Sequence, residues 1–227
     1  MNRLLYGCRA LVVLAVVGMP LFADAGGARD SNRDSNRDRH TPLAVVRISD
    51  YLNNLRQFTA RFVQVTDKGG YASGRLYIQR PGRMRVDYDL PNQLQIIADG
   101  SNVIFYDPSF NSINSMPLEE FPAGVLLGHA IDLGGERFRV ASFEKKDNMF
   151  EVVVHDRQAS GSASGGSKVR LFFSDNPLRL EQWSLKDARG ENVRVLLRDV
   201  RAVSRLDPEL FVFRPPRRQD LPPFRSR

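Results

Sequence analysis

From Phe58 onward, apolar and polar residues alternate along most of the chain, which is the period of a β-strand with one buried and one solvated face. The pattern is clearest over 83–88, where Met84, Val86 and Tyr88 alternate with charged residues. Similar runs predict strands over 60–66, 73–79, 83–90, 93–99, 103–107, 112–116, 137–145, 149–156, 168–174, 178–187 and 192–203, with a last short strand near 211–213.

Short turn sequences separate these runs. Asp99-Gly100 has the composition of a tight hairpin turn, and Pro91-Asn92 predicts the preceding corner. Asp147-Asn148 and Asp175-Asn176-Pro177 separate later strands in the same way. Because short turns join antiparallel neighbours, the chain predicts an antiparallel meander.

Only two segments have a different period. Thr41-Pro42 has the composition of a helix start, and Val45, Ile48, Leu52 and Leu55 then recur at three- and four-residue spacing. This spacing predicts a helix of about four turns with one apolar stripe.

The second segment, residues 118–128, has poor strand propensity and is called the lid segment below. Leu118, Phe121, Val125 and Leu126 could share a helical face, but Pro122 and Gly124 limit its length. We expect one or two short helical turns that end at Gly128.

These elements predict a mainly β (α+β) fold of about eleven strands in which the helices must bury their apolar faces. A closed barrel that fills its own interior satisfies the pattern. An open half-barrel with its concave side covered by the helices satisfies it equally. The pattern alone leaves both architectures open.

A series of motifs runs along the predicted strands: Phe58-Thr59-Ala60-Arg61-Phe62-Val63-Gln64, then Arg80-Pro81-Gly82-Arg83, Ala98-Asp99-Gly100 and Tyr106-Asp107. This series resembles the LolA family of outer-membrane lipoprotein carriers. The order and spacing of these pieces are more specific than any one of them, and the resemblance covers roughly 45–213. It implies the open half-barrel, with a helical lid over an apolar cavity.

The resemblance also implies which residues line that cavity, although each could equally be an ordinary core residue. From the strands these are Met84, Val86, Tyr88, Leu94, Ile96, Val103 and Phe105, and from the lid side Ile48, Leu52, Phe121, Val125 and Leu126. Many family members carry aromatic residues at the positions of Met84 and Val86. The family's shape of pocket therefore does not transfer to this chain.

Arg80 matches the family's arginine before proline, which the resemblance implies hydrogen-bonds the lid and holds the empty cavity shut. A planar guanidinium with five donors suits that role, because it can bond several backbone carbonyls at once. Without the resemblance, an arginine before Pro81-Gly82 would be read as a solvated turn residue.

The first residues of the chain predict export. Arg3 and Arg9 form a basic region, residues 10–22 are apolar, and Ala23-Asp24-Ala25 has the pattern of a cleavage site. We expect a signal peptide over 1–25, although a retained membrane anchor is the alternative. A disordered linker is expected over 26–40, the carrier domain over 41–213, and a Pro- and Arg-rich tail over 214–227.

The formal net charge of +7 would ordinarily raise nucleic acid as a partner. Predicted export argues against nucleic acid, and the arginines are scattered over the strands instead of forming one patch. A basic surface that approaches anionic membranes or an acidic partner is a weaker reading that stays open.

No group of residues predicts catalysis, a cofactor or a metal site. His40, His129 and His155 lie apart from one another and from paired carboxylates. The Gly/Ser-rich residues 161–168 lead into a strand, which is unlike a phosphate loop, and no serine has the surroundings of a hydrolase nucleophile. We therefore predict a protein that is not an enzyme.

The resemblance, together with the predicted export, implies a monomeric periplasmic carrier that accepts lipoproteins from an inner-membrane ABC transporter. It would hold their acyl chains and deliver them to an outer-membrane acceptor. The alternative is an envelope-stress sensor or lipid-binding regulatory module of the same fold. A lipid hydrolase is disfavoured because no nucleophile site is found.

Overall fold

The computed structural model describes residues 43–157, 167–186 and 190–215. The predicted signal peptide, the 26–40 linker, the Thr41-Pro42 helix start, the Gly/Ser loop and most of the tail lie outside these residues.

The described chain forms one α-helix, eleven strands and short 3₁₀ turns. In chain order these are α1 (Leu43–Asn54), β1 (Gln57–Thr66), β2 (Tyr71–Gln79), β3 (Arg83–Tyr88), β4 (Gln95–Asp99), β5 (Asn102–Asp107), β6 (Ser112–Pro117), η1 (Leu118–Glu120), η2 (Gly124–Leu126), β7 (Phe138–Lys146), β8 (Met149–Asp156), β9 (Ser167–Ser174), β10 (Arg179–Lys186), β11 (Asn192–Ala202) and η3 (Pro208–Phe211).

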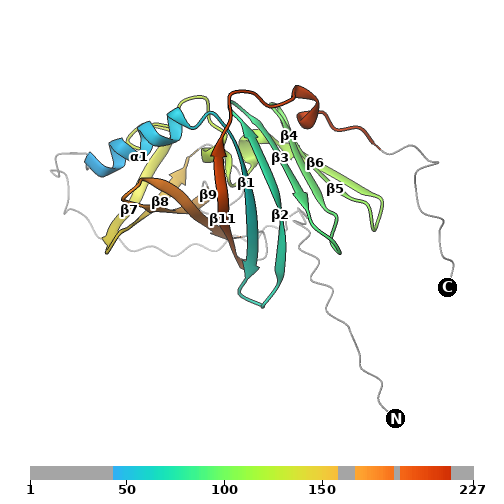
Figure 1. The fold of residues 1–227 in the computed structure, drawn as a ribbon, viewed down its shortest axis with the longest axis horizontal. Helices are drawn as coiled ribbons and strands as arrows, with labels where there is room; N and C mark the ends of the chain where they lie inside the picture. The colour runs from blue at the N-terminus through green and yellow to red at the C-terminus, as the bar shows by residue number, and fades with distance from the viewer. Residues whose placement is uncertain (1–42, 158–166, 187–189, 216–227) are drawn as a thin grey trace, which may run out of the picture.

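All eleven strands belong to one antiparallel sheet, in the order β6-β5-β4-β3-β2-β1-β11-β10-β9-β8-β7. The first and last strands of the chain therefore pair at the centre, with Phe58 opposite Ala202 and Thr66 opposite Val193. β6 and β7 form the two edges and do not pair with each other, so the sheet curls without closing (Figure 1). This is the open half-barrel that the resemblance implied.

The strand register confirms the faces predicted from alternation. Val86 lies opposite Leu76 on one side and Ile96 on the other, and Ile96 in turn lies opposite Phe105. Met84, Ala98 and Val103 form the adjacent row. Side chains of one row point to the same face of a sheet, so the predicted residues of β3–β5 share the concave face.

α1 covers the half of the concave face formed by β8–β10. Its buried residues Val45, Ile48 and Leu52 have the predicted spacing, and the helix has 12 residues. The Tyr51 hydroxyl accepts a hydrogen bond from the Leu180 amide at 3.2 Å, and the Tyr51 ring packs edge-on against Phe173. Each such apolar side chain contributes about 1.5–3 kcal/mol when it is fully buried.

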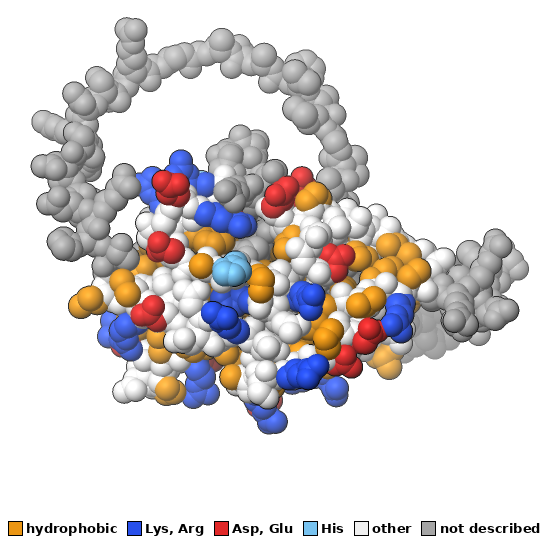
Figure 2. All heavy atoms as spheres, turned by 90° about the horizontal axis from the view of Figure 1, so that it is seen from above, with side chains coloured by type: hydrophobic (Ala, Val, Ile, Leu, Met, Phe, Trp, Pro, Cys, Tyr) orange, Lys and Arg blue, Asp and Glu red, His pale blue; other side chains and the backbone are white. Residues whose placement is uncertain are grey.

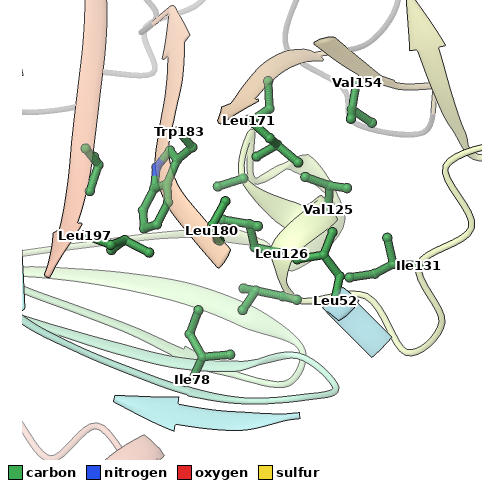
Figure 3. Close-up of a cluster of buried hydrophobic side chains, with 14 of the residues drawn as sticks. Leu52, Ile78, Val125, Leu126, Ile131, Val154, Leu171, Leu180, Trp183 and Leu197 are labelled. Carbon is green, nitrogen blue, oxygen red and sulfur yellow. The ribbon is translucent and has the colours of Figure 1, made fainter. Parts of the chain in front are cut away.

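The lid segment contains the two short turns predicted for it, η1 and η2, and Gly124, Val125 and Leu126 are buried. Figure 3 shows Val125 and Leu126 inside the hydrophobic cluster, with Leu52 and Leu180 around them. The lid segment is therefore part of the core and not a loop that lies over it.

The strand predicted near 211–213 is wrong, because η3 occupies Pro208–Phe211 instead. Asp207 caps this turn by accepting a hydrogen bond from the Glu209 amide, and Pro208 occupies its first turn. Phe211 packs on the convex side of the sheet, where Arg85 donates to the Leu210 carbonyl at 3.2 Å. Phe211 and Phe213 alternate as in a strand, but Asp207-Pro208 just before them has the composition of a helix start.

Gly74 is the position of β2 at which the sheet tolerates no side chain. A Cβ atom there would lie 2.2 Å from the Asp87 carbonyl oxygen and 2.6 Å from the Phe62 ring. Because Gly74 has no side chain, the rings of Phe62 and Tyr88 can pack edge-on, with their centroids 5.1 Å apart.

We predict that Gly74→Ala lowers the free energy of unfolding by about 1–3 kcal/mol, measured by urea denaturation. Alanine restricts the unfolded chain and would stabilise by about 0.4–1 kcal/mol where it fits, but the overlap with backbone atoms outweighs that gain. Gly124→Ala is the control, because its Cβ would meet nothing closer than 3.7 Å. Equal stability of the two variants would contradict this account.

Candidate functional site

A hollow of about 110 Å³ lies on the concave face, between the sheet and the lid segment. Its walls are almost wholly apolar and carry no charged side chain. They are formed by Phe62, Gln64, Leu76, Ile78, Met84, Val86, Tyr88, Ile96, Phe121, Ala123, Leu126, Trp183, Leu185, Val193 and Val195. β1–β4 form one wall, β10 and β11 another, and the lid segment closes the side toward the core.

Half of the predicted cavity residues line this hollow: Met84, Val86, Tyr88, Ile96, Phe121 and Leu126. The others lie elsewhere. Ile48, Leu52, Val103 and Val125 are buried in the packed core, Phe105 packs against that core, and Leu94 is half-buried just before β4. Alternation identifies a face of the sheet but not which part of that face is covered by helix.

Sequence reasoning missed the wall opposite β3. Val193, Val195 and Trp183 reach the hollow because β11 pairs with β1, a contact between residues far apart in the sequence. The inward face of β1, with Phe62 and Gln64, was missed as well. The alternation in both strands was visible, but no local pattern shows that β1 and β11 are neighbours.

One polar pair interrupts the apolar walls. The Tyr88 hydroxyl donates to Gln64 Oε1 at 2.7 Å, and the Gln64 side chain is buried. Burial raises the pKa of Tyr88, so the hydroxyl stays protonated and remains a donor.

Arg80 lies between β2 and β3 and contacts the end of α1. Its Nη2 donates to the Leu55 carbonyl at 2.7 Å, and its backbone amide donates to the Arg56 carbonyl at 2.8 Å. Burial, followed by repulsion from the Arg56 guanidinium, lowers the pKa of Arg80 to about 10. Arg80 therefore remains a cation near neutral pH. Among the described residues its guanidinium makes one hydrogen bond, to the carbonyl directly after α1, and none to the lid segment, where the resemblance allowed several.

α1 and the lid segment together form the cover of the hollow, and a few further polar contacts hold this cover in place. The Gly82 amide donates to the Leu127 carbonyl at 2.8 Å, which joins the β2–β3 turn to the lid segment. The Asn53 side chain donates to the Ile131 carbonyl and accepts from the Ile131 amide, both at 2.9 Å. α1 and the stretch that follows the lid segment are thereby joined by a reciprocal pair of hydrogen bonds.

The hollow is too small to hold an acyl chain in this state. A cavity of about 150 Å³ takes one benzene molecule, and this one measures about 110 Å³. A larger, open hollow of about 320 Å³ lies on the convex side, where Phe211 and Phe213 pass Arg83 and Asp99. Its walls are more polar and it is not covered by the lid segment, so it does not have the character of a lipid site.

The outer surface has mixed charge. Figure 2, viewed from above, shows Lys and Arg side chains interspersed with Asp and Glu over the part of that face that is described. Within the described ranges, no helix is long and apolar enough to cross a membrane. The same residues contain no group of three or more His, Cys, Asp or Glu side chains that could hold a metal ion.

Comparison with known proteins places the chain in a family. Residues 53–214 match the model of the outer membrane lipoprotein carrier protein LolA. An outer-membrane lipoprotein carrier protein from Methylococcus capsulatus is 30% identical over 178 residues, which cover 75% of this chain and 83% of that protein. The corresponding protein from Pseudomonas aeruginosa is 28% identical and covers 95% of this chain and 96% of its own length.

Among solved structures, a LolA superfamily protein from Nitrosomonas europaea aligns with a TM-score of 0.44 and 13% identity, over 74% of this chain and 97% of that one. The sequence matches show that the chain belongs to the LolA family, whose members are carrier proteins.

The Asn53–Ile131 pair predicts that Asn53→Ala loosens the attachment of α1 to the chain beyond the lid segment. Because both hydrogen bonds are lost, we expect the Ile131 amide to exchange with solvent deuterium about tenfold faster or more. The matched control is Asn54→Ala, which changes the exposed neighbour on the same helix. Exchange at Ile131 that is alike in the two variants would contradict a holding role for Asn53.

Proposed function

We propose that this protein is a periplasmic carrier that binds the acyl chains of lipoproteins in the hollow beneath its lid segment. The observation that supports this most directly is an uncharged, apolar hollow between a curved sheet and a cover held by few polar contacts. Carriers need such a site because each methylene exposed to water costs about 0.8 kcal/mol.

Loading requires the cover to move, because the closed hollow is smaller than one acyl chain. Each hydrogen bond that holds the cover contributes about 0.5–1.5 kcal/mol net, so opening the Arg80, Gly82 and Asn53 contacts costs several kcal/mol. A chain of more than ten methylenes contributes roughly 8 kcal/mol or more when it is buried. Acyl burial therefore exceeds the cost of opening, and that cost offsets part of the binding free energy, which eases release.

Arg80 acts as a latch in this proposal. Its guanidinium holds the carbonyl of Leu55, directly after α1, and its position beside the β2–β3 turn links the helix to the wall of the hollow. Cargo that displaces the cover breaks this hydrogen bond, and re-forming it helps expel the cargo. Met84 on the adjoining strand supplies a flexible side chain that adapts to chains of different shape.

The partners follow from this role. Lipoproteins enter from an inner-membrane ABC transporter and leave to an outer-membrane acceptor, and the carrier crosses the periplasm as a monomer with one cargo molecule. The carrier performs no covalent chemistry.

The carrier role predicts that the purified chain from residue 26 onward releases a radiolabelled lipoprotein from proteoliposomes that contain the transporter. The released lipoprotein should elute from a sizing column in a soluble one-to-one complex, because its acyl chains are covered. Omission of ATP is the control. Lipoprotein that stays in the membrane fraction in the presence of an active transporter would refute the proposal.

The latch predicts that Arg80→Leu holds cargo more tightly and transfers it severalfold more slowly. In this variant, closing of the emptied hollow no longer gains the Arg80–Leu55 hydrogen bond, so release is less favourable. Transfer to acceptor-containing liposomes measures this. Arg83→Leu is the matched control, because Arg83 begins β3 directly after the same turn, with its side chain exposed on the convex side. Unchanged transfer by Arg80→Leu would exclude the latch.

A further inference from the structure

The hollow contains an amide donor without a protein acceptor. Gln64 is 6% exposed, and its Oε1 is occupied by the Tyr88 hydroxyl at 2.7 Å. This bond orients the amide group, and Gln64 Nε2 donates to no other residue in the described part of the chain. A nine-tenths buried amide thus presents its N–H groups at the wall of an apolar space.

Trp183 adds a second donor to the same wall. It is 8% exposed, and its indole Nε1 has no acceptor among the described residues. Val195 of β11 lies opposite Gln64 of β1 on one side and opposite Trp183 of β10 on the other. The two donors therefore belong to one row across three strands, and their backbones lie about 10 Å apart. Figure 3 shows the indole of Trp183 projecting from β10, beside the cluster that contains Ile78 and Leu197.

Neither donor atom is fully buried, since Gln79 Oε1 is the buried side-chain polar atom without a partner among the described residues, and both Gln64 and Trp183 line the hollow. A ligand that displaces water from these donors and brings no acceptor leaves them unsatisfied, at a cost of about 1–3 kcal/mol each, so this row favours a ligand with acceptor atoms. A plain hydrocarbon chain brings none. A carboxylate brings acceptors but also a charge, and no cation lines the hollow to compensate for its burial. A neutral carbonyl oxygen accepts hydrogen bonds and brings no charge into the hollow.

We propose that Gln64 Nε2 and Trp183 Nε1 bind the ester or amide carbonyl oxygens at the heads of acyl chains. This inference rests on the proposed carrier function and deepens it, because the site would recognise the linkage of the chains and not only their length. Tyr88 is a positioning residue, since its hydroxyl holds the Gln64 amide in the donating orientation.

The test compares lipids that differ only at the carbonyl. One pair is a synthetic lipopeptide with two ester-linked palmitoyl chains and its counterpart with two ether-linked hexadecyl chains. The other is the diacyl and dialkyl forms of phosphatidylglycerol. Trp183 is the single tryptophan of the chain, so its fluorescence reports binding in the hollow directly.

We expect the ester lipopeptide to bind about fivefold to tenfold more tightly than its ether counterpart. Gln64→Leu should lose most of this preference by weakening ester binding while the ether form binds at least as well. Ile96→Val is the matched control, because it alters an apolar wall residue and should change both affinities alike.

The outcomes separate the two proposals. Equal binding of ester and ether forms by the unaltered protein would overturn the inference and leave the carrier function standing. A preference that persists in Gln64→Leu would overturn the role of Gln64. Binding of neither lipopeptide would contradict the carrier function itself. A preference seen in the phospholipid pair alone would support carbonyl binding and assign it to membrane lipid in place of the lipoprotein.

Discussion

The pairing of β1 with β11 is the interaction on which the rest of the structure depends. It joins the two runs of neighbouring strands, β1–β6 and β7–β11, into one curved sheet. The hollow lies across this pairing, with Gln64 on one strand and Val195 directly opposite on the other. If β11 did not pair with β1, each half would be a separate sheet with an exposed apolar face, and the hollow would not exist.

The concave face is divided into a tightly packed part and a loosely packed part. Over β8–β10, Ile48 of α1 and Val125 of the lid segment lie in one core cluster with Leu171 of β9, and all three are almost fully buried. Beside β1–β4 the cover stops short and leaves the hollow. The packed part supplies stability. In the proposed carrier role, the incompletely filled part would exchange lid side chains for acyl chains at little cost in buried apolar area.

Much of the fold is predictable from the sequence, because alternation and turn residues act locally. The eleven strands, the Asp99-Gly100 turn and the short turns of the lid segment follow from such patterns. The site is only partly predictable. Met84 and Val86 belong to a run whose inward face is evident, whereas Trp183 reaches the hollow through strand order, which local patterns do not encode. Phe211 shows the opposite failure, since its alternation with Phe213 suggested a strand where Asp207 and Pro208 begin a 3₁₀ turn.

The distance along the chain between β1 and β11 also has a consequence for assembly. Pairings between residues as far apart as Phe58 and Ala202 raise the contact order, and proteins with many such contacts fold slowly. The walls that hold Gln64 and Trp183 meet only when the last strand arrives. The hollow is therefore complete only after β11 has been synthesised and has paired with β1 and β10.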